Sequence, residues 1–188
     1  MNFPSHDLET SPEESKSLLE NSQKAFGRLP GLHRVLAESP QAFEGYQLLH
    51  KLFTETAFDA EELTVVWQSI NVEHACHYCV PAHTGIAKMM KVSDELSTAL
   101  RNETPLPSAK LEALRTFTVQ MVRERGNVSE AQMQVFFDAG YGHRAVLDVI
   151  LGLAQKTMSN YINHVAETPV DEVFHPLKWE RVDTPLKV

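Results

Sequence analysis

Helical periodicity runs through almost the whole of this 188-residue chain. Between residues 60 and 75, four apolar side chains recur at the spacing that places them on one face of a helix: Leu63, Val66, Trp67 and Ile70. Helical patterns also occupy residues 11–27, 41–56, 80–92, 93–101, 109–126, 130–140 and 142–167. No stretch alternates apolar and polar residues in the way that predicts a strand. The sequence therefore predicts an all-α fold.

Residues that cap helices mark the boundaries between these segments. Serine and aspartate side chains accept hydrogen bonds from the first free N–H groups of a helix, and they stand before the segments as Ser11, Ser39, Asp59, Ser93, Ser108 and Ser129. The length and the continuous pattern indicate a single domain over residues 1–188. From about residue 168 the chain contains Pro169, Pro176 and Pro185, which predict an extended tail that packs on a neighbour.

Charge and hydropathy exclude several classes of function. The chain has 25 acidic and 17 basic residues, a net charge of −8, so its surface repels a phosphate backbone and nucleic acid is not an expected partner. No apolar run approaches the roughly 20 residues that span a bilayer. The N-terminus lacks the basic and apolar regions of a secretory signal. We therefore expect a cytoplasmic protein without a membrane partner.

The stretch EHACHYCVPAHT, residues 73–84, contains both cysteines of the chain. A structural disulfide between Cys76 and Cys79 would close a very small loop and remove little chain entropy, and the cytoplasm keeps thiols reduced. Zinc could be held by Cys76, Cys79 and His83 with His74 or His77 as a fourth ligand, but all these residues come from one short segment. A redox-active dithiol is the interpretation that we favour.

The redox interpretation depends on where the next helix begins. Pro81 cannot donate a backbone hydrogen bond and fits best in the first turn of a helix. Cys76 and Cys79 would then lie at the helix N-terminus, where the free N–H groups stabilise a thiolate. His83 follows Cys79 by four residues, one helical turn, and is placed to accept the proton of the thiol. The residues predict a low-pKa cysteine, a partner cysteine and a base.

The motif Cys-His-Tyr-Cys-Val-Pro-Ala-His-Thr resembles the Cys-x-x-Cys-x-x-x-His signature of the alkylhydroperoxidase D-like (AhpD-like) branch of the carboxymuconolactone decarboxylase superfamily. The segments LPGLHRVLAESPQAFEGY, EALRTFTVQMVRERGNVSE and KTMSNYINHVAETP resemble its single-domain, peroxidase-related members. The resemblance implies an all-helical homo-oligomer, a trimer or hexamer. It also implies reduction of hydroperoxides, or of a partner's disulfide, without a cofactor or metal, and regeneration by a dithiol or disulfide reductase partner. Cys79 would be the thiolate beside His83, and Cys76 its disulfide partner.

The sequence departs from the best-studied members at two positions. Thr64 stands where they have a glutamate that completes a proton relay, and Tyr78 stands where they have a histidine. Glu73, three residues before Cys76, is the candidate replacement for the glutamate. Asn160 and His164 lie one turn apart on the final helix and could border the site or a subunit contact. The expected catalytic residues are therefore Cys76, Cys79, His83 and Glu73.

Overall fold

The computed structural model describes residues 3–181 of the chain. Its elements are α1 (Glu13–Phe26), α2 (Gly31–Leu36), α3 (Pro40–Thr54), α4 (Ala60–Glu73), α5 (Cys79–Met89), α6 (Asp94–Arg101), α7 (Ala109–Arg123), α8 (Glu130–Asp138), α9 (His143–Val165) and a 3-10 helix, η1 (Glu172–Leu177). Within the described residues there is no strand, and the predicted all-α fold is confirmed.

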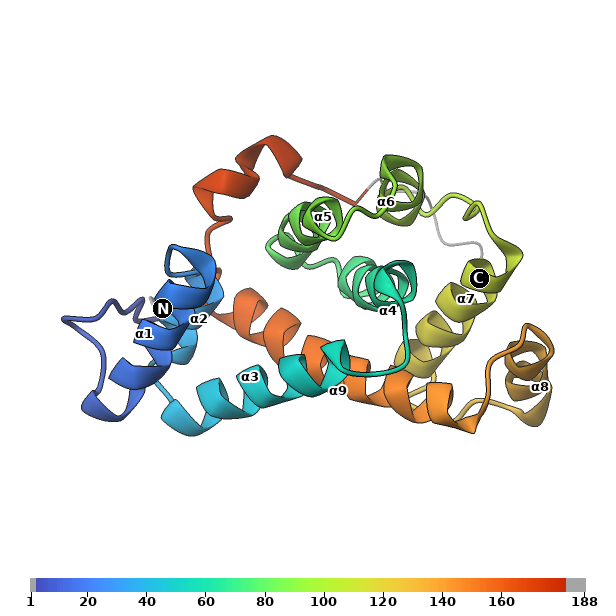
Figure 1. Cartoon of the computed structure of the whole chain (residues 1–188), viewed down its shortest axis with the longest axis horizontal. Helices are drawn as coiled ribbons and strands as arrows, with labels where there is room; N and C mark the ends of the chain where they lie inside the picture. Colours follow the sequence, from blue (N-terminus) through green and yellow to red (C-terminus); the bar gives the residue numbers. More distant parts are fainter. Residues whose placement is uncertain (1–2, 182–188) are drawn as a thin grey trace.

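Helix α4 forms the centre of the molecule (Figure 1). Helices α5 and α6 lie on one side of it, α3 and α9 on the other, and α7 packs against its remaining face. Eleven consecutive residues of α4, Glu62 to Val72, are buried, which is typical of a helix surrounded by others. The loop and helix that carry the cysteine motif follow α4 directly and therefore lie in the interior.

The caps predicted from the sequence begin five of the helices. Ser39, Asp59, Ser93, Ser108 and Ser129 each accept a backbone N–H three residues later. Helix α1 differs from the prediction, because Pro12 occupies the N-cap position and makes no side-chain hydrogen bond there. Gly27, with a φ of 67°, ends α1 in the left-handed conformation that glycine adopts without strain.

The tail, predicted to be extended, contains a short helix within the described residues. Residues Glu172–Leu177 form η1, which packs on α5 of the same molecule. A Cβ atom on Gly85 would lie 2.4 Å from the ring of Phe174, so the missing side chain of Gly85 allows this contact. Farther along, the Arg101 guanidinium donates hydrogen bonds to the carbonyls of Leu177 and Lys178. Pro185 lies outside the described residues.

Helix α9 crosses α3 and α4 at Gly152, and this crossing gives a test of the core. A Cβ atom there would lie 2.7 Å from Phe53 Cε2 and 2.9 Å from Val66 Cγ1. We expect Gly152→Ala to destabilise the protein by about 1–3 kcal/mol, because both neighbours are buried and must move. Gly45→Ala is the matched control: nothing lies within 4 Å of its Cβ position, so it should stabilise by up to about 1 kcal/mol. Urea unfolding of both variants measures the difference, and equal effects would contradict the packing described here.

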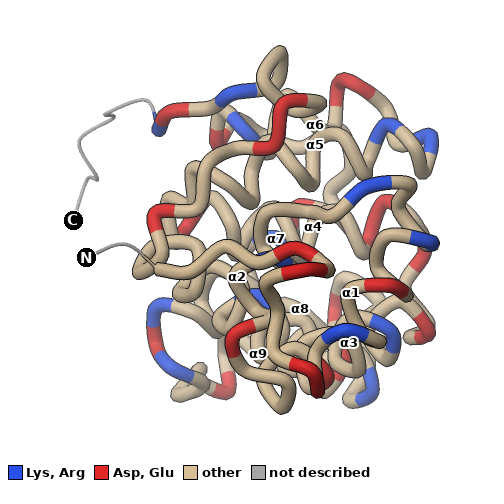
Figure 2. The backbone as a smooth tube through the Cα atoms, turned by 90° about the vertical axis from the view of Figure 1, so that its left-hand side faces the viewer, with Lys and Arg blue, Asp and Glu red and all other residues tan. Residues whose placement is uncertain are grey.

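Charged residues of both signs are distributed over the molecule, as their numbers in the sequence lead one to expect. Lysine and arginine positions are interspersed with aspartate and glutamate along the backbone, without a continuous basic stretch in the face shown in Figure 2. None of the helices in residues 3–181 is both long and apolar enough to span a membrane.

Candidate active site

The cysteine motif forms the start of α5, as the position of Pro81 predicts. Cys79 is the first residue of the helix and Pro81 the third. Ala75, with a φ of 50°, turns the chain between α4 and α5. The backbone N–H of Cys79 then donates to Cys76 Sγ at 3.3 Å, so the thiol of Cys76 occupies the place of a helix cap. Both cysteines are free thiols and both are buried.

Amide side chains from the central and final helices hold the first turn of α5 in place. Asn71 donates to the carbonyl of Cys79 at 3.4 Å and Gln68 to that of Val80 at 3.1 Å. Asn160 on α9 donates to Asn71 Oδ1 at 3.0 Å. All three amide side chains are fully buried, and a buried hydrogen-bonded network of this kind fixes a single arrangement.

The environment of Cys79 favours its thiolate form. Burial opposes the charge, but a hydrogen bond with Cys76 and the positive charge of Lys156 outweigh burial and lower the pKa of the Cys79 thiol. Hydrogen bonds from Asn163 and Asn160 act in the same direction, and Asn163 Nδ2 lies 3.2 Å from Cys79 Sγ. The pKa of Cys76 is raised, first by its hydrogen bond with Cys79 and then by burial. Of the two thiols, Cys79 is therefore the one whose surroundings favour the thiolate form.

His83 lies close to the cysteine, but its nearest polar partner is Lys156. The Nε2 atom of His83 is 2.9 Å from Lys156 Nζ, and the two side chains are 6 % and 1 % exposed. Burial, followed by the charge of Lys156, lowers the pKa of His83 well below its usual value. The imidazole is therefore neutral, and when Lys156 is an ammonium group Nε2 accepts its hydrogen bond.

A cavity of about 310 Å³ lies in front of these groups. Cys79, His83 and Lys156 contribute to one part of its wall, while Cys76 is not among the lining residues. The remaining wall is mostly apolar or aromatic and includes Phe26, Leu32, Tyr46, Ala82, Ile86, Met89 and Phe174. Of the two cysteines, Cys79 therefore borders a cavity with a mostly apolar wall, whereas Cys76 does not.

Tyr78, between the two cysteines, joins the motif to the tail. Its hydroxyl donates to Asp171 Oδ2 at 2.9 Å and accepts from the N–H of Leu32 at 3.2 Å. Asp171 also accepts from Arg28 at 2.6 Å and from the N–H of Gly31 at 2.9 Å. Burial, followed by the charge of Asp171, raises the pKa of the phenol. Tyr78 thus fixes the cavity wall and is not a proton acceptor at neutral pH.

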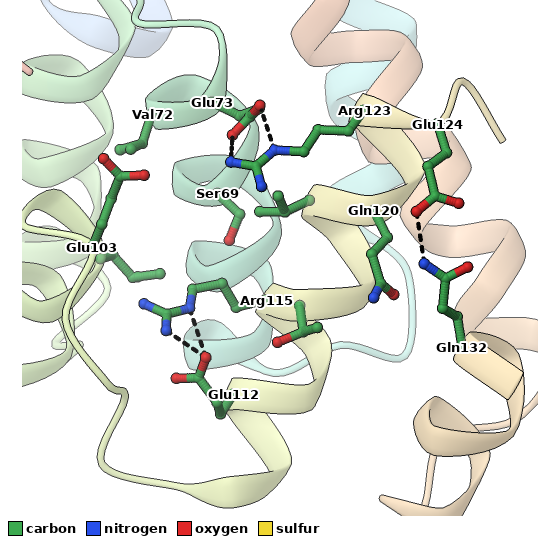
Figure 3. Close-up of a pocket in the computed structure, with 13 residues that line it drawn as sticks. Ser69, Val72, Glu73, Glu103, Glu112, Arg115, Gln120, Arg123, Glu124 and Gln132 are labelled. Atoms are coloured by element: carbon green, nitrogen blue, oxygen red, sulfur yellow. Dashed lines mark hydrogen bonds and ion pairs between the residues drawn. The ribbon is translucent and has the colours of Figure 1, made fainter. Parts of the chain in front are cut away.

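The structure does not bring Glu73 to the thiols. Its carboxylate is bound at both oxygens by Arg123, with two distances of 2.8 Å (Figure 3). These residues line a separate pocket between α4 and α7, together with Arg115 and Gln120. Thr64, at the position of the missing glutamate, donates to the carbonyl of Ala60. The position of Glu73 does not support its expected part in a proton relay.

We expect Glu73→Gln to leave peroxide turnover unchanged, because the carboxylate is held by Arg123 outside the cavity that contains Cys79. The substitution should cost at most about 1 kcal/mol of stability, as for other partly exposed ion pairs. Steady-state turnover and urea unfolding measure the two effects. A large loss of turnover at unchanged stability would restore Glu73 to the proton relay.

The two histidines considered as a fourth zinc ligand are bonded to groups other than the cysteines. His74 donates to Asn160 Oδ1 at 2.9 Å, and His77 lies 3.0 Å from the carbonyl of Thr168. In the described part of the chain, no three histidine, cysteine, aspartate or glutamate side chains gather closely enough to hold a metal ion.

Helix α9 contributes site residues that the sequence reasoning missed. Of the two α9 residues singled out, Asn160 borders the site, whereas His164 is exposed. Lys156, Ser159, Asn160 and Asn163 are all buried and recur at helical spacing. This polar face, within a segment that is otherwise rich in apolar residues, is the signal that could have identified Lys156 and Asn163.

No protein-family profile matches the chain, and neither does any curated protein sequence. Solved structures do match. The AhpD core of an uncharacterized peroxidase-related protein from Ralstonia eutropha JMP134 superposes with a TM-score of 0.82 and 18% identity, over 92% of this chain and 93% of that one. An uncharacterized peroxidase-related protein from Silicibacter sp. TM1040 gives a TM-score of 0.78 and 18% identity, over 93% of each chain.

A third similar structure is the debrominase Bmp8, as a cysteine-to-alanine variant in complex with 2,3,4-tribromopyrrole. It has a TM-score of 0.77 and 12% identity, over 94% of this chain and 95% of that one. The same architecture therefore serves more than one chemistry. The chain has the all-α fold of the AhpD-like proteins, with its cysteine pair at the N-terminus of α5.

Proposed function

We propose that the protein is a thiol-dependent peroxidase that reduces hydroperoxides with the Cys76–Cys79 dithiol. The observation that carries the proposal is the position of the Cys79 thiol. It lines a largely apolar cavity, its pKa is lowered by Cys76, Lys156 and two asparagines, and a second thiol lies beside it. A thiolate, an access route and a resolving thiol are what this reaction requires.

In the first step the Cys79 thiolate attacks the terminal oxygen of the hydroperoxide. The S–O bond forms while the O–O bond breaks, so that Cys79 becomes a sulfenic acid. The alkoxide that leaves takes up one proton, from a group of the site or from water, and becomes an alcohol. Cys76 then attacks the sulfur of Cys79. A disulfide forms and the hydroxyl group leaves as water with the proton of Cys76. An external dithiol restores both cysteines by exchange.

The cavity also indicates the size of the partners. Cys76 is fully buried and Cys79 is 2 % exposed, so the dithiol meets small molecules through the cavity more readily than the disulfide of a folded protein. Its aromatic and aliphatic wall suits an organic hydroperoxide better than hydrogen peroxide, because apolar surface is buried on binding. Disulfide reduction in a partner protein is the weaker alternative.

One experiment tests the proposal. Reduced protein is mixed with one equivalent of cumene hydroperoxide or of hydrogen peroxide, and free thiols are counted over time. We expect both thiols to be lost together, faster than free cysteine is oxidised, with the organic hydroperoxide reacting faster. Oxidation no faster than that of free cysteine with both reagents would exclude a peroxidase.

A further inference from the structure

Lys156 is a buried lysine without a carboxylate partner. It lies on α9, is 1 % exposed, and no Asp or Glu of residues 3–181 is within ion-pair distance of it. The titratable groups around it are His50 of α3, the Cys76 thiol before α5, and Cys79 and His83 of α5. Both histidines are kept neutral by burial.

The charge of Lys156 therefore depends on the cysteines. Burial disfavours the ammonium form, whereas Cys79 and Cys76 stabilise it. In the reduced protein, the Cys79 thiolate supplies the opposite charge. Once Cys79 is oxidised, that charge is gone, and a buried ammonium group without a counter-charge is strongly disfavoured. A change in the oxidation state of the dithiol must then change the protonation state of Lys156.

We propose that Lys156 is the proton carrier of the redox cycle, giving a proton to the leaving oxygen when Cys79 is oxidised and regaining one when the disulfide is reduced. The inference rests on the proposed function. Lys156 and Cys79 line the same cavity, and the Nζ atom of Lys156 is hydrogen-bonded to His83, a third residue of that wall. His83, 2.9 Å from Nζ, acts as a positioning residue that holds the amine and accepts its hydrogen bond.

The atoms and charges balance over the cycle. The thiolate and the ammonium group react with the hydroperoxide to give a sulfenic acid, an alcohol and the neutral amine of Lys156. Formation of the disulfide then releases one water and leaves the amine neutral. An external dithiol supplies two electrons and two protons. One proton remains on the Cys76 thiol and the other returns to Lys156, while Cys79 becomes a thiolate again.

Proton counting during reduction tests the proposal without any peroxide. The wild-type protein is oxidised with diamide, freed of reagent and reduced with dithiothreitol at neutral pH in dilute buffer. Ultraviolet absorbance follows the thiolate, and an indicator dye follows proton release. We expect one thiolate per chain with no net proton released, because Lys156 takes up the proton that Cys79 gives up. One proton released with each thiolate would overturn the proposal, and so would reduction to two protonated thiols.

The Lys156→Arg variant is the matched comparison, because a guanidinium group retains its charge at all accessible pH values. We expect it to form the thiolate but to release one proton per chain. Equal proton release from the two proteins would contradict the proposal. Failure of diamide to form the disulfide at all would instead contradict the proposed function, so the two ideas fail by different results.

Discussion

Cys79→Ser is expected to reduce peroxide turnover to the uncatalysed background. A serine hydroxyl is not ionised near neutral pH and cannot replace the thiolate. The remaining thiol, Cys76, does not line the cavity, and its pKa is raised by its hydrogen bond with Cys79 and by burial. Turnover with an organic hydroperoxide and an external dithiol measures the loss.

Cys76→Ser is the matched control for this variant. It retains the Cys79 thiol and its cavity, so one equivalent of hydroperoxide should still oxidise it, to a sulfenic acid that dimedone traps. Without the resolving thiol no internal disulfide forms, and repeated turnover is lost. Full turnover in Cys79→Ser would show that Cys79 is not required for the reaction. Dimedone labelling of Cys76 in Cys79→Ser, with no labelling of Cys79 in Cys76→Ser, would show that the two thiols have the opposite roles.

Lys156→Met is expected to slow the reaction of Cys79 with hydroperoxide at neutral pH. Without the ammonium group, the pKa of Cys79 should rise, because the charge of Lys156 is one of the factors that lower it, and a smaller fraction of the thiol is then ionised at neutral pH. Oxidation by hydroperoxide should then be slower than in the wild type at neutral pH and accelerate as the pH rises through the higher pKa of Cys79. Methionine has a similar volume and the Cys79 thiol can take up a proton, so the loss of stability should be limited to about 1–3 kcal/mol, the cost of leaving buried His83 Nε2 without its hydrogen-bond partner.

Thiolate absorbance against pH, the rate of oxidation against pH and thermal unfolding measure these effects. Lys51→Met, at a side chain that is 70% exposed, is the control and should change none of them. An unshifted thiol titration in Lys156→Met would show that Lys156 does not stabilise the thiolate.

The fold is largely predictable from the sequence because its determinants are local. Caps such as Asp59 and Ser129 bond to N–H groups three residues away, and the apolar repeats fix which face of each helix is buried. The tail was less predictable, because η1 depends on contacts with Gly85 and Arg101, which are far from it in sequence. The predicted assembly into trimers or hexamers stays a prediction.

The site, too, was predictable from the sequence only where its geometry depends on residues that are close together in the chain. The start of α5 follows from Pro81, and Cys76 and Cys79 lie where that start places them. Lys156 is 73 residues from His83 in sequence and reaches it only through the packing of α9. Glu73 is adjacent to the motif in sequence, but it ends α4 and the turn at Ala75 separates it from the thiols. Proximity along the chain was a poor guide to proximity in space.

The central claim is that Cys79 is a thiolate at neutral pH because of the charge and hydrogen bonds around it. The most direct measurement is the thiolate absorbance of the reduced wild-type protein as a function of pH, with Cys79→Ser as the blank. We predict one thiolate per chain already present at neutral pH and absent from the blank. Absorbance that appears only above about pH 8, as for ordinary thiols, would contradict the account.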